Sequence, residues 1–172
     1  MTDQLLIGCG SRRVNLMRDG AWDRLVTLDI NPDHRPDVEW DLSRLPLPFG
    51  DESFDEIHAY EVLEHVGRQG DYRFFFAQFG DFWRILRPGG LFVASVPMPG
   101  TGWAWGDPSH TRVISRESIT FLIQPQYDQV GKTSMSDFRH IYREDFDLTA
   151  DQEIDGTWVF ALRAVKPSRV HR

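Results

Sequence analysis

The sequence predicts an α/β fold: a doubly wound, mostly parallel seven-stranded sheet that ends in an antiparallel hairpin. Through residues 1–96, short apolar runs alternate with helical patterns, as they do in parallel sheets covered by helices. Beyond residue 97 this alternation stops, and two strand-like runs flank Asp155 and Gly156. An Asp-Gly pair favours a two-residue hairpin turn. An antiparallel hairpin at the edge of a parallel sheet is a common mixed arrangement.

Each strand is expected where a short apolar run is bounded by turn-forming residues. The first such run ends in Gly8-Cys9-Gly10, and the proline-rich stretch 45–50 is an extended link before the fourth run. Proline disfavours the helical conformation for itself and for the residue before it. The expected strands are residues 4–7, 24–30, 37–40, 54–59, 91–96, 145–154 and 157–165.

The helices are expected from apolar periodicity and from capping residues. Phe75, Phe79, Phe82 and Leu86 recur at helical spacing, which indicates one apolar helix face. Ser115 is a typical N-cap for a later helix. The expected helices are residues 11–18, 61–66, 71–86 and 115–123.

Composition favours a globular protein of one domain, residues 1–172, in a reducing compartment. The chain has one cysteine, Cys9, which excludes an internal disulfide and a multi-cysteine zinc site. No signal peptide is visible, and no apolar run approaches the ~20 residues of a membrane helix, so a cytoplasmic location is expected. The net charge of −7 makes a nucleic-acid partner unlikely. The basic tail 166–172 is expected to be a frayed terminus.

A nucleoside-binding crevice is predicted after the first strand. Glycines at positions 8 and 10 allow a tight bend and close approach of a ligand to the backbone. Asp29 ends the second strand at the spacing typical of an acidic residue that binds ribose hydroxyls. A dinucleotide fingerprint would carry glycine where Arg13 stands, and no P-loop pattern occurs. A nucleoside without a polyphosphate is therefore favoured.

Several motifs occur in a fixed order along the chain. Residues 5–10 read Leu-Leu-Ile-Gly-Cys-Gly, and residues 47–57, 61–66 and 84–92 carry three further patterns that flank the fourth and fifth strands. Together they resemble the motifs of class I S-adenosylmethionine-dependent methyltransferases, most closely over residues 5–96. This resemblance implies a Rossmann-like fold, methyl transfer as the activity and S-adenosyl-L-methionine as the cofactor.

The resemblance also implies cofactor contacts. Asp29 matches the residue that holds both ribose hydroxyls, Asp41 and Leu42 match the pair that flanks adenine, and residues 60–66 lie near the methionine end. This chain departs from the family pattern at Leu6, where many members have an acidic residue, and at Arg12, where many have glycine. The expected cofactor-binding residues are Gly8, Cys9, Gly10, Asp29, Ile30, Asp41, Leu42, Tyr60 and Glu61.

Two histidines are candidate general bases. Methyl transfer requires a base only where the acceptor retains a proton that it does not readily lose. His65 follows the fourth strand, and His110 lies in the loop after the fifth, where Asp107 could orient it. As alternatives, His65 is an ordinary polar residue on a short helix, and His110 belongs to a turn capped by Asp107 and Ser109. No residue is assigned as a metal ligand.

The acceptor site is expected within residues 97–140, where residues 98–112 form a long loop. Trp103 and Trp105 either wall an acceptor pocket or anchor this loop on the core. A small-molecule or saccharide-type acceptor is favoured. The alternatives are a nucleic-acid or protein acceptor, or a catalytically inactive cofactor-binding scaffold, which the departures at Leu6 and Arg12 would suit. The sequence leaves the oligomeric state open.

Overall fold

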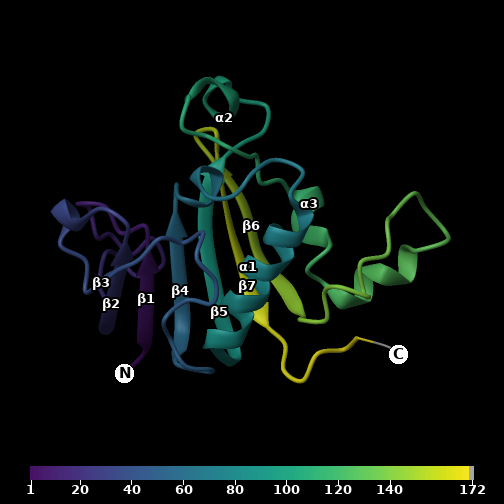
Figure 1. Ribbon diagram of the computed structural model, residues 1–172, viewed down its shortest axis with the longest axis horizontal. Helices are drawn as coiled ribbons and strands as arrows, with labels where there is room; N and C mark the ends of the chain where they lie inside the picture. Colours follow the sequence, from purple (N-terminus) through teal and green to yellow (C-terminus); the bar gives the residue numbers. More distant parts are fainter. Residues whose placement is uncertain (171–172) are drawn as a thin grey trace.

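A seven-stranded mixed sheet organises the computed structural model, which describes residues 1–170 (Figure 1). The strand order is β3-β2-β1-β4-β5-β7-β6. The predicted fold class is confirmed, and the predicted strands lie within a few residues of the observed ones. The strands are β1 (Asp3–Ile7), β2 (Arg24–Asp29), β3 (Val38–Glu39), β4 (Phe54–Tyr60), β5 (Leu86–Pro97), β6 (Phe146–Ile154) and β7 (Thr157–Ala164).

The direction of the chain through the sheet reverses between β1 and β4. From β1 the chain moves outward to β2 and β3, whereas from β4 it moves the opposite way to β5, and all these pairs are parallel. The hairpin of β6 and β7 then adds antiparallel to β5. In open α/β sheets, the crevice beyond the strand ends at such a reversal is where ligands bind.

The helices are fewer and shorter than the sequence predicts. The predicted helix 11–18 does not form. Asn15, buried at 1% exposure, instead accepts the Met17 backbone N–H and donates to the Ala21 carbonyl. Such side-chain bonds compete with helix formation. The helices are α1 (Tyr72–Ile85), α2 (Gly102–Gly106) and α3 (Arg116–Thr120), with 3-10 turns η1 (Pro32–His34), η2 (Leu63–His65) and η3 (Gln124–Gln129).

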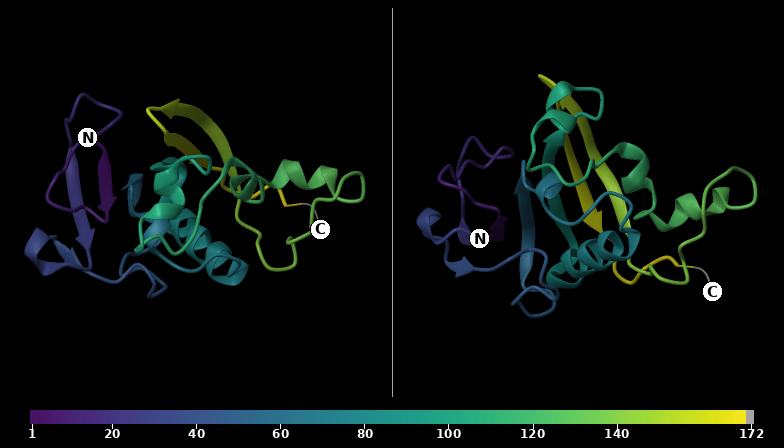
Figure 2. Two further views of the ribbon diagram at one scale, coloured as in Figure 1. Left: turned by 90° about the horizontal axis from the view of Figure 1, so that it is seen from above. Right: turned by 45° about the horizontal axis from the view of Figure 1, so that its top comes forward.

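Helix α1 covers one face of the sheet and supplies much of the core (Figure 2). It begins where the Asp71 carboxylate accepts the Phe74 backbone N–H. Its buried Phe79 and Phe82 rings lie 5.6 and 4.8 Å from the Phe92 ring of β5. The helix ends one residue before the prediction, because Leu86 pairs with β4 as the first residue of β5.

The C-terminal segment docks on the core, so the prediction of a frayed tail is wrong for its described part. The Lys166 ammonium donates to the Leu86 carbonyl at 2.6 Å. The Arg169 guanidinium donates to both oxygens of Asp145, which is fully buried. Residues 171–172 lie outside the described residues. Among residues 1–170, no helix is long and apolar enough to cross a membrane.

Candidate functional site

A cavity of about 450 Å³ opens at the C-terminal ends of β1, β2 and β4. It lies at the point where the direction of the sheet reverses, and its volume is within the range of small-molecule sites. Seven of the nine predicted cofactor residues line it. The lining residues are Gly8, Gly10, Asp29, Ile30, His34, Trp40, Asp41, Leu42, Ser43, Glu61, Val62, His65, Val66 and Gly67.

The bend after β1 depends on glycine. Gly8 has a φ of +59°, and a Cβ atom there would lie 2.3 Å from the Val62 Cγ2 atom. Gly10 also has a positive φ, but a Cβ atom there would meet nothing within 4 Å. Position 8 therefore needs glycine for space and conformation, whereas Gly10 leaves open room beside the cavity.

The Asp29 carboxylate is held in place by backbone donors. It accepts the N–H of Gly10 at 2.9 Å and that of Asn31 at 2.8 Å. Burial opposes ionisation of Asp29, but these two hydrogen bonds and the nearby His34 outweigh it and lower the pKa of the carboxyl. The His34 Nδ1 atom lies 3.2 Å from Asp29 Oδ2, although the ring is not oriented for a hydrogen bond. Asp29 thus presents a fixed negative charge to the cavity.

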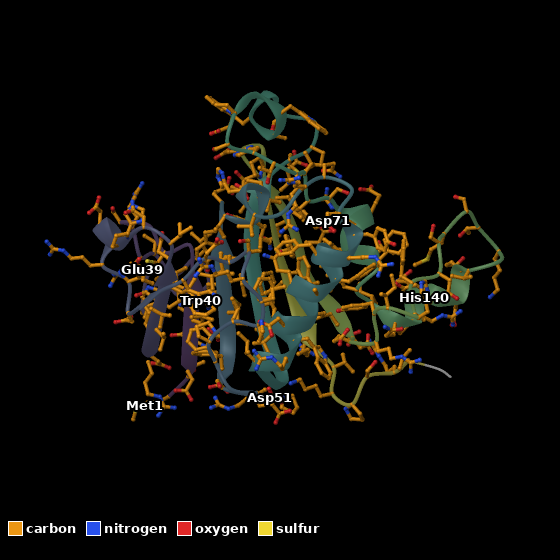
Figure 3. The ribbon with its side chains drawn as sticks, in the orientation of Figure 1. Met1, Glu39, Trp40, Asp51, Asp71 and His140 are labelled. Atoms are coloured by element: carbon orange, nitrogen blue, oxygen red, sulfur yellow. The ribbon has the colours of Figure 1, made fainter. Side chains whose placement is uncertain are left out.

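Apolar side chains line the cavity beside Asp29. Ile30 is 63% exposed, Leu42 is buried, and the Trp40 ring is fixed because its indole N–H donates to the Arg44 carbonyl (Trp40 is labelled in Figure 3). Asp41 adds a carboxylate, of which one oxygen accepts the Ser43 backbone N–H at 2.8 Å. An apolar wall with a few fixed polar groups is typical of a nucleobase or cofactor site.

Two predicted cofactor residues direct their side chains elsewhere. Cys9 is buried, and burial together with the charge of Asp29 raises the pKa of its thiol. The Tyr60 hydroxyl lies 2.6 Å from His58 Nδ1 and accepts the Leu16 backbone N–H, and burial raises its pKa to about 12. Neither residue lines the cavity.

The rim of the cavity after β4 is a strained turn. Glu61 has a φ of +50°, which is uncommon for a residue other than glycine. Its backbone N–H donates to the Ser95 carbonyl, and its carboxylate accepts the Ser95 hydroxyl at 2.8 Å. These bonds to β5 hold the turn. The predicted helix 61–66 is accordingly reduced to the single 3-10 turn η2.

The two candidate bases meet beside this rim. The rings of His65 and His110 lie 4.7 Å apart, edge to face. His65 lines the cavity. The His110 side chain is only 8% exposed and does not line it, but it packs against the His65 ring. The Asp107 Oδ2 atom is 3.9 Å from His110 Nε2, too far for a hydrogen bond, and Asp107 Oδ1 accepts the Ser109 N–H and hydroxyl.

A buried carboxylate that the sequence analysis did not single out lies next to these histidines. The Glu64 side chain is 3% exposed, and neither of its oxygens has a hydrogen-bond partner among the residues that the structure describes. Burial raises the pKa of Glu64 to about 7. The guanidinium of Arg112 contributes a nearby positive charge, but it donates to the Leu63 carbonyl and to Gln78 Oε1.

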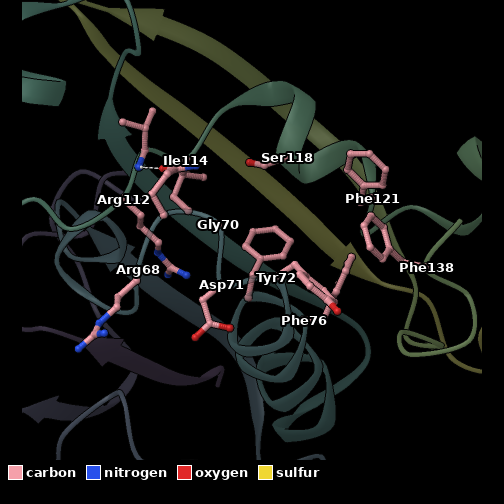
Figure 4. Close-up of a pocket in the computed structure, with 13 residues that line it drawn as sticks. Arg68, Gly70, Asp71, Tyr72, Phe76, Arg112, Ile114, Ser118, Phe121 and Phe138 are labelled. Atoms are coloured by element: carbon pink, nitrogen blue, oxygen red, sulfur yellow. Dashed lines mark hydrogen bonds between the residues drawn. The ribbon is translucent and has the colours of Figure 1, made fainter. Parts of the chain in front are cut away.

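A second cavity, of about 210 Å³, lies between the start of α1 and the region of α3 (Figure 4). Five of its thirteen lining residues are aromatic, and Arg68, Asp71 and Arg112 add charged groups. Part of its lining comes from the predicted acceptor region 97–140. The residues of that region are Arg112, Val113, Ile114, Ser118, Phe121 and Phe138.

The loop after β5 contradicts one of the two expectations for its tryptophans, which is anchorage on the core. The other, a wall of an acceptor pocket, stays a prediction, and Trp105 lines a small cavity of about 80 Å³ together with His110. The loop contains the short helix α2, which lies beyond the C-terminal end of β5 (Figure 1). Trp103 and Trp105 are 76% and 68% exposed, so they do not anchor the loop on the core, and only Ala104 between them is buried. Neither tryptophan lines the cavity at the ends of β1 and β4.

Residues 5–94, more than half of the chain, match the family model described as a methyltransferase domain. The chain belongs to this family. The membership confirms the predicted resemblance to methyltransferases. The methyltransferase domain match covers β1 to β5 up to Ala94, and so includes every strand that borders the cavity.

Known proteins similar to this methyltransferase domain share its fold. A probable S-adenosylmethionine-dependent methyltransferase of Mycolicibacterium smegmatis is 36% identical over 98 residues, which cover 54% of this chain and 34% of the relative. The chain thus spans about a third of that relative. The N-methyltransferase NodS from Bradyrhizobium japonicum, solved with S-adenosyl-L-homocysteine, has a TM-score of 0.59 at 17% identity, covering 95% of this chain and 78% of NodS. A methyltransferase from Archaeoglobus fulgidus has a TM-score of 0.57 at 14% identity, with coverages of 93% and 85%.

Sequence reasoning missed several residues of the site. Trp40 directly precedes Asp41 at the end of β3, so its position in the sequence could have indicated it. Gly67 follows the 61–66 motif and could have been found in the same way. His34 gave no such signal, because its placement depends on contacts between separate loops. Glu64 lies within the 61–66 motif, but its burial without a partner could not be read from the motif. Leu6, where the chain departs from the family pattern, is a buried residue of β1. Arg12, the other departure, is exposed.

Proposed function

We propose that this chain transfers the methyl group of S-adenosyl-L-methionine to a small-molecule or saccharide-type acceptor. The observation that carries the proposal is the cavity in which the glycine bend at Gly8 and Gly10 meets the fixed carboxylate of Asp29. Membership of the methyltransferase domain family supports the same interpretation. The complex of NodS with S-adenosyl-L-homocysteine is a precedent for a nucleoside thioether on this fold.

The donor set of the cavity suits S-adenosyl-L-methionine, which supplies an electrophilic methyl group when it is bound. A carboxylate has about four lone-pair sites, and backbone N–H groups use two of those on Asp29. The remaining sites can accept the two ribose hydroxyls. Ile30 and Leu42 would then flank the adenine. Asp41 Oδ2, which is not bonded to Ser43, would accept a hydrogen bond from the exocyclic amine of the adenine.

The methionine end would lie between the glycine bend and the turn after β4. Gly8 permits the close approach of a ligand, and Glu61 fixes the opposite rim through Ser95. The Cys9 and Tyr60 side chains point away from the cavity. We therefore propose that these two residues contact the methionine end of the cofactor through their backbone. Positioning of the reacting groups is the main contribution that the protein makes to such a transfer.

For a hydroxyl or amine acceptor, His65 is the residue that can take up the proton, because its ring borders the cavity. His110 supports this ring by an edge-to-face contact from behind. Asp107 would orient His110 if the 3.9 Å separation of their side chains closed to hydrogen-bond distance. All three remain candidate catalytic residues.

The second cavity supports a compact acceptor. Aromatic rings such as those of Tyr72, Phe76 and Phe121 suit the apolar face of a sugar or of another ring (Figure 4). The net charge of −7 disfavours a nucleic-acid duplex. A single domain over residues 1–172, with acceptor choice in residues 97–140, and a cytoplasmic location both stay predictions.

The proposal is tested in two steps. Isothermal titration calorimetry with S-adenosyl-L-methionine and S-adenosyl-L-homocysteine should give saturable binding of one equivalent of each. A panel of sugars, small amines, oligonucleotides and peptides is then screened for release of S-adenosyl-L-homocysteine. Turnover with the oligonucleotides or peptides alone would replace the proposed acceptor class. Binding without turnover on any acceptor would favour a scaffold, and absence of binding would refute the proposed function.

A further inference from the structure

The carboxylate of Glu64 is buried without a hydrogen bond beside the rim of the cavity. Its side chain is 3% exposed, and both oxygens lack a partner. The nearest guanidinium, that of Arg112, directs two of its nitrogens at the Leu63 carbonyl and at Gln78. Buried carboxylates in proteins are generally paired or coordinate a metal ion. Within residues 1–170, no group of the protein supplies a hydrogen-bond partner for the Glu64 carboxylate.

Two imidazoles converge on the same point. His65 Nε2 lies 3.9 Å from Glu64 Oε1, and one ligand atom from each of Glu64, His65 and His110 lies within 4.8 Å of the others. His110 Nδ1 is also buried and has no hydrogen-bond partner. Three groups on two separate loops therefore share one gap.

The second nitrogens of these rings have neighbours suited to orienting metal ligands. His65 Nδ1 lies 3.3 Å from the Ser109 carbonyl, so a proton on Nδ1 would leave the lone pair of Nε2 directed toward Glu64. His110 Nε2 lies 3.9 Å from Asp107 Oδ2, so this carboxylate could accept its N–H only after the two side chains move closer, and Nδ1 would then be left for the gap. Histidines that bind metals usually donate their other N–H to a carbonyl or a carboxylate in this way.

We propose that Glu64, His65 and His110 bind one divalent first-row transition-metal ion, with Zn²⁺ as the best match. Two imidazoles and one carboxylate form a donor set that zinc and its neighbours accept, and such a set leaves at least one coordination position open. Metal–ligand distances of about 2.0–2.2 Å require the three ligand atoms to move inward by about 1 Å. The partly exposed His65 ring can make this movement.

The open position would face the cavity, because His65 is one of its lining residues. A ring nitrogen that binds the ion cannot also accept a proton, so the histidines would act as ligands in the metal-bound protein. The ion would then bind an acceptor oxygen and lower the pKa of its hydroxyl. This last step rests on the proposed function, whereas binding of the ion does not.

The test measures metal binding alone, without cofactor or acceptor. Tag-free protein, first stripped with EDTA and dialysed, is titrated with zinc chloride in a calorimeter. We expect one saturable equivalent for the natural chain and at least a tenfold loss of affinity in Glu64→Gln, His65→Gln and His110→Gln. The control is His140→Gln, because this exposed histidine lies in a part of the molecule far from Trp40 and the cavity (Figure 3).

Thermal unfolding of each variant shows whether a loss of affinity reflects a loss of fold. Because His65 is the least buried of the three ligands, His65→Gln is the variant most able to keep the fold. Co²⁺ gives a second measurement on the natural chain, where visible absorption bands should appear at one equivalent and disappear with excess Zn²⁺. Absence of saturable Zn²⁺ binding, or unchanged affinity in a folded His65→Gln variant, would overturn the proposal. Neither result would affect the calorimetric test with S-adenosyl-L-methionine.

Discussion

Replacement of Asp29 by alanine tests the ribose-binding role of the cavity most directly. In the structure the carboxylate is fixed by the backbone N–H groups of Gly10 and Asn31, and its pKa is lowered, so it is ionised at neutral pH. The side chain is nearly buried at the end of β2, with its free lone pairs on the cavity side. Its loss should therefore reduce cofactor affinity without opening the core.

The magnitude follows from the bonds that would be lost. Two ribose hydroxyls donating to a carboxylate would contribute about 1.5–3 kcal/mol each. Water that enters the site of Asp29 would solvate the hydroxyls and the freed N–H groups, and so restore about half of this sum. A net loss of about 2 kcal/mol remains, which corresponds to a ~30-fold weaker Kd at 25 °C.

The assay is calorimetry with S-adenosyl-L-homocysteine, which cannot be consumed. Asp33→Ala serves as the matched control, because Asp33 is an exposed carboxylate on the adjacent turn η1 and does not line the cavity. Thermal unfolding of both variants reports on the fold. A folded Asp29→Ala variant with the Kd of the natural chain would refute the ribose assignment. An equal loss of affinity in Asp33→Ala would show that general charge, and not a specific bond, is responsible.

Three further changes test the fold that supports the site. Gly8→Ala places a methyl group 2.3 Å from Val62 in a positive-φ conformation. The free energy of unfolding in urea should fall by about 2–4 kcal/mol. An unchanged unfolding midpoint would contradict the close approach of the two residues. Arg169→Ala leaves the fully buried Asp145 without its ion pair. We expect the free energy of unfolding to fall by about 2 kcal/mol, which is below the value for a fully buried pair because the Arg169 side chain is 38% exposed. A frayed tail would give no change. Phe82→Ala removes a ring with no exposed surface and should cost about 3–5 kcal/mol in the same assay, with a small effect counting against the packing of α1.

The cavity at the ends of β1 and β2 could be predicted from the sequence because its signals are local. The bend at Gly8 and Gly10 is determined by backbone sterics within a few residues, and Asp29 ends a short apolar run that is bounded by turn-forming residues. Asp41 and Leu42 follow the next strand. Because parallel strands end at the same edge, identifying the strands was enough to bring these residues to one cavity.

The neighbourhood of His65 and His110 was less predictable because it is built from side chains that are distant in the chain. The contact of His65 with His110 depends on how the loop after β5 returns over η2, where the Thr111 backbone N–H donates to the Glu64 carbonyl. No periodicity encodes such a return. The direction of the Tyr60 side chain likewise depends on His58 and on a backbone group of the β1–β2 connection.

By itself, the sequence determined the order of the strands along the chain, the hairpin at Asp155-Gly156 and most of the predicted residues that line the cavity at the C-terminal edge of the sheet. These features follow from side-chain period and turn chemistry, which act over a few residues. Only the tertiary structure decided that Glu64 is buried without a partner between two imidazoles, and that Arg169 ties the C-terminal segment to Asp145. Burial and charge pairing depend on the whole packed chain, because they are set by neighbours that the local sequence does not specify.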